Sequence, residues 1–548
     1  MFRTGAGMNL IEDHWMPVRR RDGSRDWIAP TQLSAPDIVA FDADRADFNG
    51  ALMQFAIGLL QTTAPIESPT AWRQLLTTPP DAQTLRDWFA PVAEAFELDS
   101  DGPRFMQDAT LASEASALNP VSALLIESPG ENALRNNSDH FVKRGRLDGI
   151  CPDCAAIALF TLQTNAPAGG VGYRTGLRGG GPLTTLLLHQ SPTSLWQDVW
   201  LNVIERPQHL ERCGDASRNS AQFRFPWLTD VASLQPSGEL APAQVHPDHI
   251  FWATPRRIRL DFDNVAHGAC DMCGRESDRL IRQFTAKNYG LNYKGAWDHP
   301  LSPYYEVKGE WLPLHPQPSG IGYRHWLAWV LGQADAKNKQ RPARIVTHAL
   351  EWRRRQLGGA LRLWAFGYDM DNMKARCWYE SNLPLYGLGE CASKEALKSV
   401  SATVETRLAG AQQSVFYLRS AVKAAWFGGD ARGDFSAIDA EFWQRTETAF
   451  YTQLRQCIEA VRQDESADPD TLESRQAWHH ALRSAALDLF DTTFVGAGPI
   501  ERQKPRRVAE AHRQLVNSLN GKKMREVLRL PAADKPAAGR GKPATADV

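Results

Sequence analysis

Four cysteines in two close pairs are the residues of this sequence best suited to bind a metal ion. Cys151 and Cys154 stand in CPDC, and Cys270 and Cys273 stand in CDMC. Each Cys-x-x-Cys turn presents two thiolates at the spacing of a tetrahedral site, so the two turns together predict a structural zinc ion. Four unrelated thiols, or a redox-active pair that explains only one motif, are the alternatives. Because the pairs are far apart in sequence, the ion would join distant parts of the chain.

A glycine-rich loop, residues 169–172, follows the first cysteine pair. Its backbone can approach a ligand closely because few side chains intervene. The loop contains neither a P-loop motif nor a dinucleotide-binding fingerprint. An ordinary turn between strands is one interpretation. The nearby Tyr173, Arg174 and Arg178 favour another, in which the loop approaches phosphate or a nucleic-acid groove and the metal ion holds the loop in place.

The composition excludes several classes of protein. A net charge of -1 gives no overall field that attracts nucleic acid, so such binding depends on local clusters of Lys and Arg. Eight Cys in 548 residues are too few for a disulfide framework, which favours a reducing, cytoplasmic location. Charges interrupt the longer apolar runs and the N-terminus lacks a signal-peptide core, so we expect no membrane span.

The first part of the chain mixes strand and helix signals. Apolar and polar residues alternate around a turn that contains Gly23, which predicts a hairpin within residues 9–30. Residues 47–60 have the period of a helix with one apolar face. Strands are expected at residues 182–188, 258–262 and 361–368, and a turn at residues 369–376.

From residue 393 onward, apolar residues recur at three- and four-residue steps, as at Val400, Val404, Leu408 and Ala411. Four such stretches, separated by turns rich in Gly, Asp and Pro, predict a helical bundle. The predicted fold class is therefore α+β, with a large mixed α/β N-terminal domain that contains the zinc site and a C-terminal four-helix bundle. We place these domains at residues 1–385 and 386–530, followed by a disordered tail at residues 531–548.

No catalytic constellation accompanies the cysteines. The Asp-His dipeptides at residues 139–140, 248–249 and 298–299 are isolated, and the sequence lacks a Gly-x-Ser-x-Gly nucleophile elbow. Four sulfur ligands fill a zinc ion and leave no position for a reacting water. The sequence therefore favours a binding protein that is not an enzyme. A zinc-containing enzyme that processes nucleic acid and a scaffold that binds only protein are the alternative hypotheses.

The order of several motifs resembles the family of large subunits (CasA) of Cascade, the type I-E CRISPR surveillance complex. The motifs are MNLIEDHWMPV from Met8, FMQD from Phe105, CPDCAAIALFTLQTNAPAGGVGYRTGLRGGGPLTT, CDMCGRES, WDHPLSPYY from Trp297 and GYDMDNMKARCWYES from Gly367. The resemblance covers nearly the whole chain and includes the helical C-terminal region. The combination is highly specific, whereas neither cysteine pair alone would be.

The resemblance implies recognition of the protospacer-adjacent motif (PAM) in double-stranded target DNA, from the minor-groove side. A glycine loop, a lysine finger and a wedge perform this recognition in the family. The glycine loop corresponds to Gly169, Gly170, Val171 and Gly172. The finger corresponds to Lys287 or Asn288, and the wedge corresponds to Asp371, Asn372 and Met373, with Asn372 in a place where the family often has Gln.

The resemblance also implies the partners. A loop before the first cysteine pair corresponds to the family's contact near the 5′ handle of CRISPR RNA, with Leu125, Asn136, Asn137 and His140 as candidate residues. Other Cascade subunits are implied partners, as is a helicase-nuclease effector that this subunit helps to recruit. The implied function is antiviral defence by a non-catalytic subunit that binds DNA and RNA, starts duplex opening and contains structural Zn²⁺.

Overall fold

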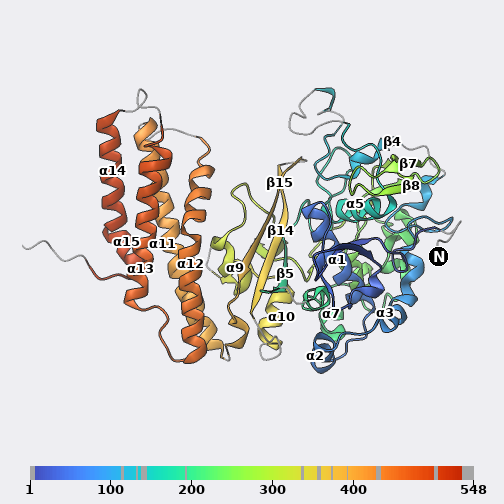
Figure 1. The fold of residues 1–548 in the computed structure, drawn as a ribbon, viewed down its shortest axis with the longest axis horizontal. Helices are drawn as coiled ribbons and strands as arrows, with labels where there is room; N and C mark the ends of the chain where they lie inside the picture. Colours follow the sequence, from blue (N-terminus) through green and yellow to red (C-terminus); the bar gives the residue numbers. More distant parts are fainter. Residues whose placement is uncertain are drawn as a thin grey trace, which may run out of the picture. The chain divides into compact units, whose positions relative to one another are not determined.

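The chain divides into two compact units (Figure 1). The first comprises Met1–Ile321 and Ala328–Glu390, and the second comprises Gly322–Leu327 and Cys391–Val548. The computed structural model describes residues 7–112, 117–130, 134–136, 145–191, 194–334, 339–353, 360–371, 374–391, 393–427, 433–498 and 504–532. Each unit has buried hydrophobic residues of its own.

Helices and strands are interspersed along the first unit, which confirms the predicted mixture of α and β structure. Its helices are α1 (Ala46–Thr63), α2 (Pro69–Thr77), α3 (Ala82–Phe89), α5 (Pro152–Asn165), α6 (Leu195–Trp200), α7 (Arg206–Leu210), α8 (Val231–Leu234) and α10 (Arg344–Trp352). The short helix α9 (Trp326–Val330) crosses the division between the two units.

The strands pair antiparallel in small sheets. Strand β1 (Met16–Arg20) lies between β2 (Arg25–Ile28) and β3 (Ile38–Phe41), and β9 (Gln283–Lys287) lies between β4 (Ala117–Pro120) and β6 (Arg257–Leu260). Strand β7 (Ala266–Ala269) pairs with β8 (Glu276–Leu280). A further sheet has the order β11 (Glu310–Pro313), β10 (Tyr304–Val307), β13 (Lys339–Arg341), β12 (Gln333–Ala334). The last has the order β15 (Lys374–Pro384), β14 (Leu361–Asp371), β5 (Thr184–His189).

The long hairpin of β14 and β15 corrects the prediction for residues 369–376. The strand expected at residues 361–368 continues to Asp371, and its partner starts at Lys374, so the expected turn is wrong for most of its length. The guanidinium of Arg376 donates to both carboxylate oxygens of Asp369, at 3.0 and 2.7 Å. This cross-strand ion pair allows polar residues typical of a turn to extend the ladder.

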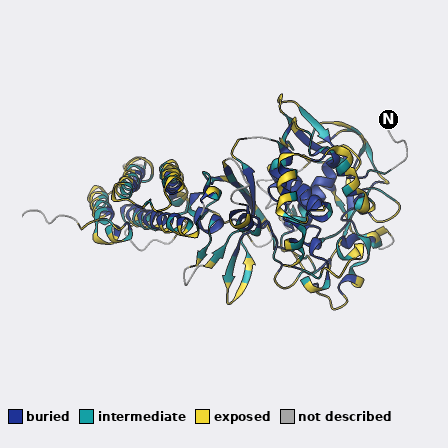
Figure 2. Cartoon of the chain, turned by 90° about the horizontal axis from the view of Figure 1, so that it is seen from below, coloured by how far each residue is buried: buried dark blue, intermediate teal, exposed yellow. Residues whose placement is uncertain are grey.

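Two buried helices form the centre of the first unit. Helix α1 contains the predicted helix at residues 47–60, and its side chains are buried on nearly every face, as are those of α5. A helix that is buried all round must lie inside its domain, and α1 and α5 contact each other there. Figure 2 shows dark blue, buried helices at the middle of this unit.

Aromatic rings fill the space around α1. The ring centroid of Phe55 lies 5.1 Å from that of Trp15 and 5.7 Å from those of Phe160 and Trp252, in edge-to-face arrangements. Trp252 is fully buried, and its indole Nε1 donates to Thr62 Oγ1 at 3.0 Å. Edge-to-face pairs add to the stabilisation that burial of the rings provides, so this cluster anchors α1 and α5.

Long helices make up most of the second unit, which confirms a helical C-terminal region. They are α11 (Lys394–Phe427), α12 (Ser436–Gln463), α13 (Leu472–Asp488), α14 (Pro505–Asn520) and the short α15 (Lys522–Val527). Helix α11 packs against α12, α13 and α14. The buried residues Val404, Leu408, Ala411 and Val415 of α11 follow the predicted three- and four-residue steps.

A short segment, Gly322–Leu327, belongs to the second unit although the chain on both sides belongs to the first. Its anchor is Tyr323, which is fully buried. The hydroxyl of Tyr323 lies 2.8 Å from Thr446 Oγ1, and its ring stacks on Phe450 with the centroids 4.3 Å apart. The sequence analysis did not predict this excursion, because a lone aromatic residue has no local signal for its distant partner.

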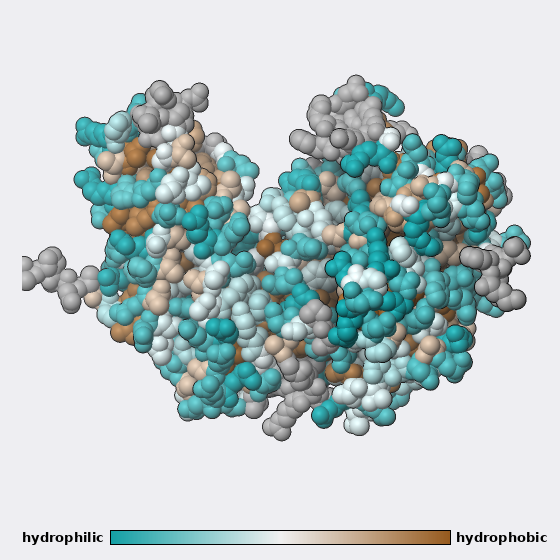
Figure 3. Space-filling view, viewed as in Figure 1, coloured by the Kyte–Doolittle hydropathy of each residue, from teal (hydrophilic) through white to brown (hydrophobic). Residues whose placement is uncertain are grey.

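Hydrophilic residues predominate on the face of the molecule seen in Figure 3, where hydrophobic residues form separate patches. Among the described residues, no helix is both long enough and apolar enough to cross a membrane. Even α11, with 34 residues, has charged side chains such as Arg407 and Lys423 along its length.

Replacement of Trp252 by Ala should destabilise the first unit by about 3–5 kcal/mol, because the change leaves a cavity among the rings that surround α1. Trp252→Phe keeps an aromatic ring and loses the hydrogen bond to Thr62, so we expect a smaller loss of about 1–2 kcal/mol. Thermal unfolding of both variants, followed by calorimetry, measures the difference. A midpoint for Trp252→Ala equal to that of the wild type would contradict the assignment of this cluster as the core.

Candidate metal centre and the loops it supports

The two cysteine pairs meet at the start of α5. Cys151 is the residue before the helix and Cys154 lies in its first turn, whereas Cys270 and Cys273 lie in the connection between β7 and β8. The four sulfur atoms lie within 4.8 Å of one another. The prediction that the two pairs come together is confirmed, and they could hold a metal ion.

The geometry of this cysteine cluster fits a tetrahedral zinc ion. With zinc–sulfur bonds of about 2.3 Å, neighbouring sulfurs of a tetrahedron lie about 3.8 Å apart. The sulfurs of Cys151 and Cys273 are separated by 3.8 Å. The backbone N–H of Cys151 donates to the sulfur of Cys270 at 3.2 Å, as expected for a sulfur that carries negative charge. Four thiolates are the donor set of structural zinc sites.

Hydrogen bonds within the cluster shift the four thiols in opposite directions, because they raise the pKa of Cys151 and Cys154 and lower the pKa of Cys270 and Cys273. Hydrogen bonds from Cys151 and Cys154 lower the pKa of the Cys270 thiol, and the same two neighbours lower the pKa of Cys273 to about 7. Arg275, two residues after Cys273, donates to Asp153 Oδ2 at 2.6 Å. Such charged groups just outside a metal site fix the ligands and offset their negative charge.

An aromatic ring joins the cluster to the N-terminal sheet. Arg275 also lies over the ring of Trp27 in β2, with its guanidinium carbon 4.3 Å from the centroid, and Arg25 lies 5.3 Å from the same centroid. Cation–π contacts of this kind are favourable for arginine over tryptophan. The β1–β2 hairpin therefore packs beside the connection that contains Cys270 and Cys273.

Helix α5 separates the cysteine cluster from the glycine loop. The cluster lies at the start of the helix and residues 169–172 follow its end. Fourteen residues of α-helix span about 20 Å, so a metal ion cannot touch the loop directly. The expectation that the ion holds the loop in place stays a prediction, and the ion would act through the far end of the helix that leads to the loop.

The end of strand β9 holds the glycine loop directly. The side-chain amide of Asn288 donates to the carbonyl of Val171 at 2.7 Å. The backbone N–H of Tyr289 donates to the carbonyl of Gly172 at 2.8 Å. At the other end of the same two segments, Ile150 and Ile281 form a backbone bridge. The two segments therefore meet both at the cysteine cluster and at the glycine loop.

This contact requires glycine at position 172. The residue has φ +80°, and a Cβ atom there would lie 2.8 Å from the Cβ of Asn288 and 3.1 Å from the ring of Tyr289. Both the backbone conformation and the close approach exclude a side chain. At Gly170, by contrast, an added Cβ would meet nothing within 4 Å.

The glycine-rich chain continues from the loop to strand β14. Gly181 has φ +60°, and a Cβ atom there would lie 2.7 Å from the Cβ of Tyr368 and 2.9 Å from the terminal carbon of Met370. The N–H of Gly181 donates to the carbonyl of Asn165 at the end of α5, at 3.1 Å. The segment between residues 169 and 181 thus contacts the end of β9 near one end and β14 at the other.

Arg178 lies within this segment but its side chain is buried, which contradicts its expected role beside a loop that approaches phosphate. Only 4% of the side chain is exposed. Its guanidinium donates to Gln54 Oε1 at 2.5 Å, to Thr184 Oγ1 at 3.0 Å and to Ser302 Oγ at 2.9 Å. Burial lowers the pKa of Arg178 to about 10, so it remains a cation and joins α1 to β5.

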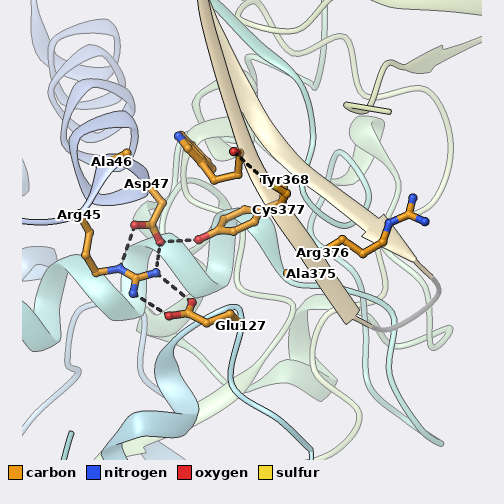
Figure 4. A pocket seen from close by; sticks show the side chains of 9 residues that line it. Arg45, Ala46, Asp47, Glu127, Tyr368, Ala375, Arg376 and Cys377 are labelled. Carbon is orange, nitrogen blue, oxygen red and sulfur yellow. Dashed lines mark hydrogen bonds and ion pairs between the residues drawn. The ribbon is translucent and has the colours of Figure 1, made fainter. Parts of the chain in front are cut away.

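A cavity of about 320 Å³ lies beside the part of the β14–β15 hairpin where β14 ends and β15 begins (Figure 4). Its lining residues are Arg45, Ala46, Asp47, Glu127, Tyr368, Ala375, Arg376, Cys377 and Trp378. Arg45 donates to both Asp47 and Glu127, and the hydroxyl of Tyr368 donates to Asp47 Oδ2 at 2.5 Å. Burial raises the pKa of Tyr368. Arg45 pairs with both carboxylates and offsets one of their two negative charges, and such a shared cation is typical of a structural ion-pair network.

The other predicted site residues have mixed outcomes. Lys287 and Asn288 are exposed at the end of β9, and Asp371 is exposed at the end of β14. Leu125 is half-buried and Asn136 is exposed. Asn137, His140, Asn372 and Met373 lie outside the described residues, as does nearly all of the predicted tail at residues 531–548.

A comparison with known families decides the identity of the chain. The family model of CRISPR-associated protein Cse1 (CRISPR_cse1) matches residues 9–489. This chain belongs to the Cse1 family. The matched region contains the cysteine cluster, the glycine loop and the β14–β15 hairpin. The resemblance found in the sequence is thereby confirmed.

Solved structures of Cse1 proteins share the fold. CasA from Thermus thermophilus is 18% identical, with 94% of this chain and 99% of that chain covered and a TM-score of 0.65. Thermobifida fusca Cse1 is 15% identical, with 96% and 99% covered and a TM-score of 0.67. A chain from a structure described as a CRISPR RNA-guided surveillance complex is 16% identical, with 94% and 100% covered and a TM-score of 0.64.

Sequence reasoning missed two residues beside the glycine loop. Tyr289 is 54% exposed and has φ +65°, and Arg256 lies with its guanidinium carbon 4.6 Å from the ring centroid of Tyr173. Tyr289 could have been predicted as a site residue, because it follows Asn288 in a basic segment that contains no Asp or Glu. Arg256 had no such signal, because only the fold brings β6 close to the loop.

Cys154→Ser should abolish metal binding, because three thiolates and a hydroxyl hold zinc poorly. We expect about one zinc per chain in the wild type and little in this variant, measured by elemental analysis after purification under reducing conditions. Cys213→Ser replaces a buried thiol outside the cluster and should leave the zinc content unchanged. Equal zinc in wild type and Cys154→Ser would contradict the four-thiolate site.

Gly172→Ala should detach the glycine loop from the end of β9, because the new methyl group occupies the space of Asn288 and Tyr289. Hydrogen exchange of the Tyr289 amide, which donates to Gly172, should become at least about tenfold faster. Gly170→Ala is the matched control and should exchange at the wild-type rate. Similar rates in all three proteins would show that the contact does not depend on glycine.

Proposed function

We propose that this chain is the non-catalytic subunit of a CRISPR RNA-guided surveillance complex that recognises the PAM in double-stranded DNA and starts to open the duplex there. Membership of the Cse1 family supports the proposal. The fold that the chain shares with a protein from such a complex also supports it. The function further includes assembly with the other Cascade subunits and recruitment of the helicase-nuclease effector.

One observation carries the proposal. The glycine-rich segment, residues 169–181, contacts the end of β9 and strand β14. These lie in the two other regions that the resemblance assigns to DNA recognition. Near its start it is hydrogen-bonded to Asn288 and Tyr289, and at its end Gly181 packs against β14. The glycine loop, the end of β9 and the β14–β15 hairpin are therefore parts of one connected structure in the first unit.

The chemistry of this region suits a minor groove. Glycines let the backbone approach base edges, and the exposed Lys287 adds attraction to phosphate. The minor groove distinguishes A·T from G·C pairs and little more, so we expect several PAM sequences to be accepted. In RNA-guided complexes the protein reads only such a short motif, and pairing with the guide RNA reads the rest.

The wedge in this proposal comprises Asp371, Asn372 and Met373, of which Asp371 ends β14, and β15 begins at Lys374. Pushing a side chain between base pairs costs about a few kcal/mol per step, so the wedge needs a rigid support. Two strands of 11 residues each provide one, and they pair from Arg362 with Pro384 up to Asp371 with Lys374. Contacts of the opened strands with the protein would offset the cost.

We include the zinc ion and the domain limits in the proposal. Zn²⁺ held by the four cysteines would act as a cross-link and supply no reaction chemistry, because four sulfurs complete its coordination. Residues 1–385 would form the domain that recognises DNA. Residues 386–530 would form the four-helix bundle, for which the packing of α11 against α12, α13 and α14 is the support.

For the guide RNA, we propose a contact through the loop that precedes the first cysteine pair. Leu125, Asn136, Asn137 and His140 remain the candidate residues. Asn136 is exposed and Leu125 is half-buried, so both side chains are accessible to a partner. Amide side chains such as that of Asn136 suit single-stranded RNA, whose base edges are free to form hydrogen bonds.

Two of the Asp-His dipeptides lie within the described residues, and these two support a role without catalysis. Asp248 and His249 are fully buried, and Asp248 accepts hydrogen bonds from Arg206 at 3.0 and 3.1 Å. His299 is only 3% exposed, and Asp298 is paired with Arg341 at 2.9 Å. A general acid or base must reach its substrate, and these side chains are instead held in the interior or in ion pairs.

Lys287→Ala and Asn288→Ala should each weaken binding of the assembled complex to target duplex by about 5- to 150-fold, the cost of one lost phosphate or base contact. The variant that changes the preference among PAM sequences identifies the residue that contacts base edges. Fluorescence anisotropy at several salt concentrations measures both effects, since loss of a phosphate contact also lowers the salt dependence.

Lys308→Ala is the matched control for this experiment, since Lys308 is exposed in the turn between β10 and β11. Its complex should bind DNA with wild-type affinity. If Lys287→Ala and Asn288→Ala also bind every PAM sequence as tightly as the wild type, the end of β9 is not a DNA contact and the proposal loses its main support.

A further inference from the structure

Two tyrosines stand exposed where the glycine loop meets the end of β9. Tyr173 directly follows the loop and is 52% exposed, and Tyr289 is 54% exposed. Tyr289 also has φ +65°, a conformation uncommon for a residue with a bulky side chain. Strained positions of this kind persist where the surrounding structure enforces them, often at functional sites. Here the hydrogen bond from the Tyr289 N–H to Gly172 enforces it.

An arginine covers one face of each ring. The guanidinium carbon of Arg256 lies 4.6 Å from the ring centroid of Tyr173, and that of Arg174 lies 5.7 Å from the ring centroid of Tyr289. Arg256 is held in place by a hydrogen bond to the carbonyl of Pro167 at 2.5 Å. Gly169 also lies against Tyr173, and Gly172 lies against the ring of Tyr289. About half of each tyrosine nevertheless remains exposed, which leaves part of each ring open to a second flat group.

The charge around the two rings suits a polyanion. Residues 164–180, 253–260 and 279–294 meet here and contain Arg and Lys but neither Asp nor Glu. Two of their arginines are paired with carboxylates from elsewhere, Arg257 with Asp108 and Arg279 with Asp99. Burial lowers the pKa of Arg256 only to about 10, so its side chain stays cationic at neutral pH. The local field is therefore positive although the whole chain is nearly neutral.

We infer that Tyr173 and Tyr289 are stacking residues for DNA bases that lose their pairing partners at this surface. Each ring, with its arginine behind it, offers one face to a base, so that arginine, tyrosine and base form three layers. Stacking on an aromatic ring accepts any base, which suits strands whose sequence differs from target to target. The arginine strengthens the layer through its contact with the ring. This inference rests on the proposed function and names residues that keep the opened strands apart.

The test compares Tyr→Leu and Tyr→Phe at both positions in the assembled complex. Leu keeps an apolar side chain without an aromatic face, whereas Phe keeps the face without the hydroxyl. At position 289 both substitutes must adopt the same positive φ as Tyr, so backbone strain does not distinguish them. The DNA probes are a paired target and the same target with a mismatched bubble beside the PAM. We expect each Leu variant to bind both probes about 5-fold or more weakly and each Phe variant to bind them within about twofold of the wild type.

Each of the following results would overturn the inference. Weak binding by the Phe variants would assign the effect to the hydroxyl groups, and a loss confined to the paired target would indicate a groove contact. Failure of the Leu variants to assemble, with normal melting of the isolated chain, would indicate a protein partner. Wild-type binding by the Leu variants, with weak binding by Lys287→Ala, would remove stacking and leave the proposed function intact. If Lys287→Ala also binds normally, the stacking inference and the proposed function are both contradicted.

Discussion

Two segments determine the position of the glycine loop: α5 with the chain that follows it, and the chain from the β7–β8 connection to the end of β9. They meet at the cysteine cluster and again at the loop, about the length of α5 away. The cysteine cluster joins the start of α5 to the connection between β7 and β8. The hydrogen bonds of Asn288 and Tyr289 join the chain after α5 to the end of β9. Because α5 is buried on nearly every face, it cannot shift without disturbing a close-packed core. The cysteine cluster, α5, the glycine loop and β9 thus form a closed ring of contacts, which we call the frame.

Such a frame suits recognition by backbone atoms. A loop whose one side chain is that of Val171 has no long, adjustable groups with which to reach a ligand, so its position must be correct before binding. This position is provided by hydrogen bonds that the loop's own backbone accepts, at the carbonyls of Val171 and Gly172. The buried Arg178 then fixes the chain beyond the loop to α1 and β5 through neutral oxygen acceptors. Adjustable groups, such as Lys287, lie at the edge of the frame.

The sequence predicted those parts of the fold and site whose signals are local. The cysteine cluster follows from the short-range geometry of two Cys-x-x-Cys turns, and α1 follows from the spacing of its apolar residues. The family, and with it the assignment of the glycine loop and of residues 287 and 288 to one expected function, came from the order of motifs along the chain. The burial of Arg178 and the excursion that contains Tyr323 were missed, because both depend on partners more than a hundred residues away.

Helix α5 sets both the distance and the relative rotation between the cysteine cluster and the glycine loop, and both change with each residue added or removed. An α-helix turns by about 100° per residue, so one residue inserted between Cys154 and the loop would rotate everything beyond it by that angle about the helix axis. The carbonyls of Val171 and Gly172 would then point away from β9 while the sulfurs stayed in register. Insertions are tolerable in the surface turns of this chain. Between the metal ligands and the loop, however, the number of residues sets the direction in which the loop points. Relatives that keep both the cysteine cluster and the loop must therefore keep a helix of the same length.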